Sequence, residues 1–127
     1  MISKRKIDWT LRSLKHWWQR RTRGWDDSDL WSLDVSLAKW IVPKLRAFQD
    51  VAIGVPGNLE GFNFLEDHDN SEFLRAKVEW RRILRKMITA FELILKDGEG
   101  HLLSKEEQQL MDEGLELFAK HFRNLWW

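Results

Sequence analysis

The residues with the clearest potential for chemistry lie between positions 17 and 31, where indole rings alternate with guanidinium groups. A flat ring beside a guanidinium group suits a stacked nucleobase whose phosphate is held by arginine. The same residue types are enriched in protein interfaces, and a basic helix that carries tryptophan can also lie on a membrane surface. The pattern predicts a ligand- or partner-binding site made of Trp17, Arg20, Arg21, Arg23, Trp25 and Trp31.

Neighbouring charges bear on this prediction. Asp26, Asp27 and Asp29 follow the arginines closely enough to neutralise them, and in that case the segment is structural. Charge is also separated along the chain: residues 1–24 carry eight Lys or Arg and one Asp, giving +7, so the remainder sums to −6 for a total of +1. Such polarity can attract phosphate-bearing partners. A second basic cluster at 75–86 offers Arg81, Arg82 and Arg85 as a secondary candidate site.

Motifs for catalysis are missing from the sequence. The chain has no cysteine, no Gly-x-Ser-x-Gly elbow and no Gly-x-x-x-x-Gly-Lys phosphate loop. Its four histidines lie far apart in the sequence, and the aspartates of 26–34 lack the spacing, central glycine and final glutamate of a calcium loop. We therefore expect a non-enzymatic protein with no metal site and no cofactor.

The composition points to a binding protein inside the cell. Nine tryptophans in 127 residues exceed what a core of this size requires, and large rings are strong anchors for a partner. Hydrophobic residues at 43% and charged residues at 32% are ordinary for a globular protein. No apolar run is long enough to span a membrane, and no apolar signal core follows the basic N-terminus. We expect a cytoplasmic protein without a membrane span.

The elements that position these residues are predicted to be helices, because apolar residues recur at helical spacing and not in alternation. Asp8 is the expected N-cap of a first helix that runs to about Arg23 and ends at Gly24. Its apolar stripe is Ile7, Leu11, Leu14 and Trp18, and its opposite face carries Arg12, His16, Gln19 and Arg23.

A second helix is expected after Ser32, with a kink at Pro43 because proline removes a backbone donor. A long loop follows, at about 54–70, and a loop of this length is functional or mobile. The apolar face of the second helix is expected to be Leu33, Leu37, Trp40, Ile41, Leu45 and Phe48.

Two more helices complete the chain. The third, at about 71–96, presents Phe73, Trp80, Leu84, Met87, Phe91 and Ile94 on one face. Ser104 and Glu107 form a capping box for the fourth, whose heptad-like seam is Met111, Leu115, Phe118, Phe122 and Leu125. We expect Phe91, Phe118 and Phe122 to be core residues that pack with Leu84. Gly114 either lets another helix approach closely or is a tolerated small residue.

Four amphipathic helices with short or moderate connections predict an all-α fold, a compact four-helix bundle. We expect a single domain over residues 1–127, with a flexible basic N-terminus at 1–6. A homo-oligomer is also expected, because an apolar seam and two terminal rings could form the core of a symmetric interface between two copies of the chain. These residues are Met111, Leu115, Leu125, Trp126 and Trp127.

Residues 25–34 read as an acidic stretch followed by Trp-Ser-Leu-Asp, and Ile-Val-Pro at 41–43 interrupts the helix that follows. Near the other end, Glu-Gly-Leu-Glu-Leu-Phe at 113–118 is followed by Leu-Trp at 125–126. In these features, which with the third helix cover most of residues 17–127, the chain resembles a group of small uncharacterised bacteriophage-encoded proteins. The resemblance implies a phage origin, expression in the bacterial cytoplasm and a variable loop around 54–70. It carries over no catalytic residue.

Surplus tryptophan, separated charge and missing catalytic motifs together favour a non-enzymatic phage accessory binding protein. The function we expect is counter-defence, by sequestering a nucleotide-type host signal. The alternatives are a protein–protein inhibitor of a host factor, or a structural protein associated with the virion or with nucleic acid. The expected partner is a nucleotide-like small ligand or a host protein, and nucleic acid is less favoured.

Overall fold

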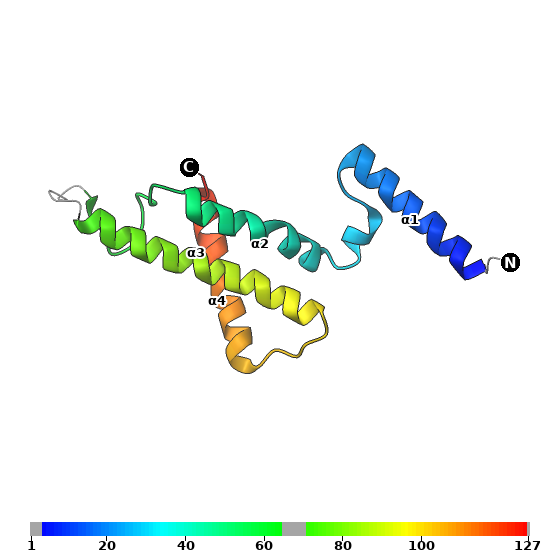
Figure 1. Cartoon of the computed structure of the whole chain (residues 1–127). Coiled ribbons are helices and arrows are strands. Elements are labelled where there is room, and N and C mark those ends of the chain that lie inside the picture. The colour runs from blue at the N-terminus through cyan, green and yellow to red at the C-terminus, as the bar shows by residue number, and fades with distance from the viewer. Residues whose placement is uncertain (1–3, 65–70, 127) are drawn as a thin grey trace. The chain divides into compact units, whose positions relative to one another are not determined.

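The protein is an all-α chain (Figure 1). The computed structural model describes residues 4–64 and 71–126, with side chains from residue 8 onward, and this part of the chain contains four α-helices and no strand. The predicted all-α class with four helices is thereby confirmed. Contacts divide the chain into two units, residues 1–37 and 38–127, and each is described by itself. That the whole chain is one domain stays a prediction.

The first unit contains α1 (Lys4–Arg23) and the short 3-10 helix η1 (Asp27–Leu30). α1 begins four residues before Asp8, so the predicted N-cap is wrong and Asp8 lies inside the helix. Lysine and arginine are good helix formers, which accounts for a helix that starts within the expected flexible N-terminus. Residues 1–3 lie outside the described part. Gly24 ends α1 with a φ of +83°, a left-handed conformation that costs glycine little.

The third element, α2 (Leu33–Val51), joins the two units. It starts where predicted, since the Ser32 carbonyl accepts the Ser36 N–H at 3.0 Å, and it continues through Pro43. Its predicted apolar face is confirmed in part: Leu45 is buried and Ile41 and Phe48 pack on the core, whereas Leu33, Leu37 and Trp40 are exposed. The core face is centred on positions 38, 42 and 45, about a quarter turn from the predicted centre, so the larger residues at 33, 37 and 40 point away from it.

The core of the second unit is built mainly by α3 (Ser71–Gly98). Its predicted apolar face is confirmed, because Trp80, Leu84, Met87 and Phe91 are all buried. α2 packs on this core, and an ion pair between Arg46 and Glu92 joins the two helices. The loop after α2 also takes part, because Leu59 is buried within the same cluster. Residues 65–70 of the predicted long loop lie outside the described part.

The last helix, α4 (Lys105–His121), crosses α3 at very close range (Figure 1). Its predicted capping box is present, since Glu107 N–H donates to Ser104 Oγ and Ser104 N–H to Glu107 Oε1, both at 3.1 Å. Gly114 is buried at the crossing. A Cβ there would lie 2.2 Å from the Lys86 carbonyl oxygen and 2.5 Å from Ala90 Cβ. The close helix approach considered for Gly114 is therefore confirmed.

The predicted aromatic seam of α4 is confirmed only in part. Phe118 is half-buried and packs edge-on against Phe91, with ring centroids 5.0 Å apart. Phe122, expected in the core, is 60% exposed and contacts the Phe118 ring edge-on, with ring centroids 5.5 Å apart. The reason is that α4 ends at His121 and the chain continues as the 3-10 helix η3 (Phe122–Asn124). A 3-10 helix has three residues per turn, so Phe122 leaves the row that an α-helix would have continued.

Among the described residues, no helix is long and apolar enough to cross a membrane.

Candidate partner-binding site

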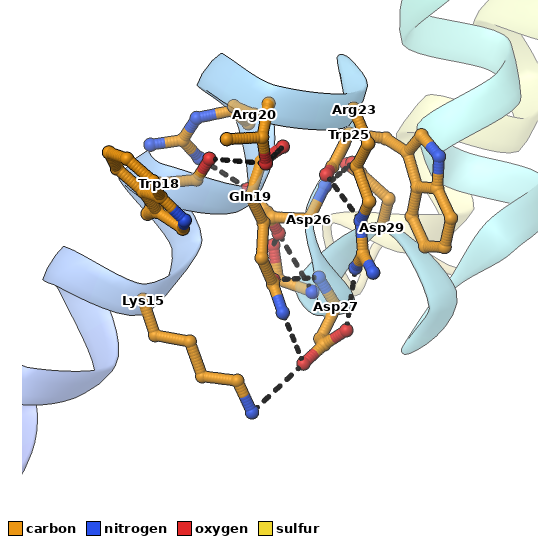
Figure 2. A network of polar contacts seen from close by, with 11 residues as sticks. Lys15, Trp18, Gln19, Arg20, Arg23, Trp25, Asp26, Asp27 and Asp29 are labelled. Carbon is orange, nitrogen blue, oxygen red and sulfur yellow. Dashed lines mark hydrogen bonds and ion pairs between the residues drawn. The ribbon is translucent and has the colours of Figure 1, made fainter.

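The predicted site segment folds as a helix and a turn held together by polar contacts (Figure 2). After Gly24 the chain reverses, and η1 lies against the face of α1 that carries Arg12, His16, Gln19 and Arg23. η1 is capped by Asp26, whose carboxylate accepts the Ser28 N–H at 2.8 Å, while the Asp29 carboxylate accepts the Asp26 N–H at 2.9 Å. The capping box fixes the turn, and the turn then presents its carboxylates to α1.

Asp27 is the centre of the contact between the two elements. Its carboxylate accepts from Gln19 Nε2 at 2.9 Å and Arg23 Nη2 at 2.8 Å, and Lys15 Nζ lies 3.2 Å away. The Asp27 N–H in turn donates to Gln19 Oε1 at 2.9 Å. The Gln19 hydrogen bond first, and then Arg23 and Lys15, hold the pKa of Asp27 well below its usual range. Asp27 therefore fastens η1 to α1 in its ionised form.

Asp26 is the buried partner of Arg20. Its side chain is only 1% exposed, and it accepts hydrogen bonds from the Ser28 hydroxyl and from Arg20 Nη1, the latter at 2.5 Å. These contacts, led by the Ser28 hydroxyl, lower the pKa of Asp26 against the opposing effect of burial. A buried carboxylate without its cation is costly, so Arg20 has a structural role.

Three rings of the segment lie beside cations. The Arg23 guanidinium carbon lies 3.7 Å from the centroid of the Trp25 ring, and Arg23 Nε donates to the Trp25 carbonyl at 3.1 Å. The His16 ring meets the Trp31 ring edge-on, with ring centroids 5.5 Å apart, and the Arg12 guanidinium carbon lies 6.0 Å from the Trp31 centroid. Arg21 and Trp17 form a separate pair, in which the guanidinium carbon lies 5.8 Å from the ring centroid.

The structure thus brings the predicted site residues together in two groups. Arg20, Arg23 and Trp25 belong to the internal network. Asp26 and Asp27 neutralise Arg20 and Arg23, as expected if the segment is structural. Asp29 instead caps the turn and pairs with no arginine in the described part. Arg21 keeps an outward position, with no carboxylate partner among the described residues. That the segment binds a ligand or partner stays a prediction.

The side of α1 that faces away from η1 is apolar, and no other part of the first unit that the structure describes covers it. Leu11, Leu14 and Trp18 are 60%, 58% and 62% exposed and follow one another at intervals of three and four residues. We call these three residues the apolar stripe of α1. Arg21 continues the row three residues after Trp18, and Trp17 lies at its flank, 52% exposed. Packing in the first unit thus uses the polar face of α1 and leaves its apolar face to solvent.

The secondary candidate site lies on the outer face of α3. Arg82 is paired with Glu79 through two hydrogen bonds, of 2.9 and 2.6 Å, which raise the pKa of Arg82 and lower that of Glu79. Arg81 and Arg85 are exposed, and in the described ranges no ion pair engages them. Two cations of the predicted cluster are therefore available to a partner.

A feature that the sequence patterns did not indicate is a buried histidine in the second unit. His121 is 4% exposed, and its ring meets the Trp80 ring edge-on, with ring centroids 5.3 Å apart. It lines a cavity of about 210 Å³ together with Glu60, Arg82 and Lys120. Asn124 Nδ2 lies 3.2 Å from His121 Nδ1, within hydrogen-bonding distance. Burial lowers the pKa of His121. No periodic pattern links residues so far apart in sequence.

No group of three or more potential metal ligands occurs in the part of the chain that the structure describes. Comparison with models of protein families, with curated proteins and with solved structures finds no match to this chain.

Proposed function

We propose that the chain is a non-enzymatic accessory binding protein of bacteriophage origin, which acts in the bacterial host cell and binds its partner through α1. The observation that carries the proposal is the orientation of α1 in its unit. Its polar face is engaged by η1, while the apolar stripe of Leu11, Leu14 and Trp18 has no cover within the described part of the unit. Exposed large apolar residues gathered on one face are typical of interaction sites. The resemblance at residues 25–34 supports the phage origin.

A large partner fits this geometry better than a nucleotide. A nucleotide site needs several free cations beside an open ring, but Arg20 and Arg23 are neutralised by Asp26 and Asp27, and Arg23 covers one face of Trp25. Of the three predicted site arginines, this leaves Arg21, beside Trp17, without a carboxylate partner among the described residues. Three cavities of the structure are lined by residues 53–126 and not by this segment. Sequestration of a nucleotide signal therefore stays a prediction, and binding of a large host partner is the function that we favour.

The proposal is tested by photo-crosslinking in bacterial cells that express the chain. A photoreactive amino acid replaces Leu14 in one variant and, as a control, the exposed Lys105 at the start of α4 in another. We expect a crosslinked product from position 14, in which the chain is joined to a host protein or to lipid, and none from position 105. The product should be lost when Leu11 and Trp18 are also replaced with glutamine. Equal products from both positions, or none from position 14, would contradict the proposal.

A panel of nucleotides in a thermal-shift assay separates the two functions. Any ligand that binds only the folded protein raises its melting temperature, by an amount that grows with the ligand concentration relative to Kd. We expect no nucleotide to change the melting temperature. A concentration-dependent rise that Arg20→Glu/Arg23→Glu abolishes would instead support sequestration.

A further inference from the structure

We propose that the partner of α1 is the surface of a lipid bilayer with anionic headgroups, on which α1 lies in the plane of the interface. This inference rests on the proposed function and names the partner of the same face. Three features of the first unit carry it: the apolar stripe, the tryptophans beside it and the distribution of charge.

The apolar stripe has the form of an interfacial helix. Leu11, Leu14 and Trp18 form one row along α1, a helix of 20 residues. Such a helix buries its apolar face at the boundary between headgroups and acyl chains while its polar face stays toward water. Tryptophan is enriched at this depth, because its ring is apolar and its N–H can bond to the headgroup region. Trp17 and Trp18, with ring centroids 6.4 Å apart, offer two such rings at one end of the stripe.

Charge favours an anionic surface. Residues 1–24 carry +7, and Arg21, which continues the stripe, has no carboxylate partner among the described residues. Basic residues close to an anionic bilayer contribute about fivefold each to binding. The carboxylates that would be repelled by such a surface, Asp26 and Asp27, lie in the network on the opposite face and are paired there with Arg20 and Arg23.

Other occupants fit less well. A nucleic acid would be held by the basic face of α1, but the cations of that face already bond η1, and the uncovered stripe offers it only apolar groups. A second α1 carries the same positive charge, so two such helices repel each other. An anionic bilayer matches both the apolar stripe and the positive charge of α1, since it takes up apolar side chains beneath a layer of negative charge.

The inference is tested by vesicle binding of the full chain. Vesicles of phosphatidylcholine mixed with phosphatidylglycerol are compared with vesicles of phosphatidylcholine alone, by co-sedimentation. Because the chain has no cysteine, Leu14→Cys carries the only thiol and can be labelled with an environment-sensitive fluorophore. Lys105→Cys, labelled in the same way, is the control. We expect binding to the anionic vesicles, an emission increase from position 14 alone, and weaker binding at high salt.

Matched variants decide which residues are responsible. Leu14→Gln should weaken vesicle binding about tenfold or more, and Arg21→Gln about fivefold. Leu102→Gln removes a leucine that is 94% exposed in the second unit and should leave binding unchanged. Circular dichroism of each variant confirms that it remains helical.

The outcomes separate this inference from the proposed function. Equal binding to both kinds of vesicle, no binding to either, or full binding by Leu14→Gln would overturn the inference. If vesicles are ignored but the crosslinker at position 14 captures a protein, the lipid partner is wrong and the proposed function stands. If position 14 neither binds vesicles nor crosslinks, both proposals are wrong.

Discussion

Replacing Gly114 with alanine inserts a methyl group at the point where α4 crosses α3. The new Cβ would lie 2.2 Å from the Lys86 carbonyl oxygen, about 1.2 Å short of the 3.4 Å at which ordinary contact begins. It would also lie 2.5 Å from Ala90 Cβ. Neither atom can rotate away, because one belongs to the backbone and the other is fixed to it. The helices must therefore separate along their shared core.

Two opposing effects set the magnitude. Alanine is a better helix former than glycine by about 1 kcal/mol, which stabilises the variant. Overpacking costs about 1–3 kcal/mol, and a clash with two rigid atoms belongs at the upper end of that range. The net expectation for Gly114→Ala is a loss of about 2 kcal/mol in the free energy of unfolding.

Urea unfolding measures this loss as a lower midpoint with an unchanged m-value. Gly54→Ala is the matched control, because a Cβ at Gly54 would meet nothing within 4 Å, and its change should stay within about 0.5 kcal/mol. The reasoning is refuted if Gly114→Ala is as stable as the original chain or gains the 1 kcal/mol that helix propensity alone would give.

Four further predictions concern the α4 capping box, the aromatic seam, and the carboxylate of Asp27 and the imidazole of His121. Ser104→Ala removes the capping box of α4 and should cost about 1 kcal/mol in urea unfolding, whereas Ser104→Asp should retain most of it. Phe118→Ala should cost about 3 kcal/mol and Phe122→Ala less than about 1, because only the first packs on the core; equal costs would contradict the solvent exposure of Phe122. The depressed pKa of Asp27 stabilises the contact of α1 with η1 above about pH 4, and this is lost as the pH falls further. The protection factors of residues 15–23, which are amide exchange rates corrected for the intrinsic effect of pH, should therefore fall at low pH, and Asp27→Asn should show low protection factors at neutral pH as well. Burial also lowers the pKa of His121, so the neutral ring contributes stability above about pH 6.5 that is lost as the pH falls further. The urea midpoint should therefore decline below about pH 6.5, and His121→Gln should remove this decline.

Local patterns predicted the helices well, because each depends on residues close together in sequence. Helical spacing identified the buried face of α3, and the capping box placed the start of α4. The same reasoning failed for Phe122, where a single change from α to 3-10 geometry removes a residue from its row. It succeeded only in part for α2, where Ile41, Leu45 and Phe48 contact the core but the large residues at 33, 37 and 40 are exposed.

The candidate site shows what periodicity leaves open. The two faces of α1 could be read from the sequence, but not which of them the rest of the unit would cover. That depends on the turn at Gly24, which brings Asp27 back to Lys15, Gln19 and Arg23. The buried His121 was not predicted for a similar reason, because its neighbours come from three separate segments.

The central claim is that the first unit leaves the apolar stripe of α1 uncovered, and thiol labelling under native conditions tests it most directly. In a chain with no cysteine, Leu14→Cys and the buried Leu84→Cys can each be labelled alone. We predict that position 14 reacts about as fast as it does in the urea-unfolded chain, whereas position 84 is protected by orders of magnitude. Comparable protection at both positions would show that the stripe is packed inside the protein, and would contradict the account.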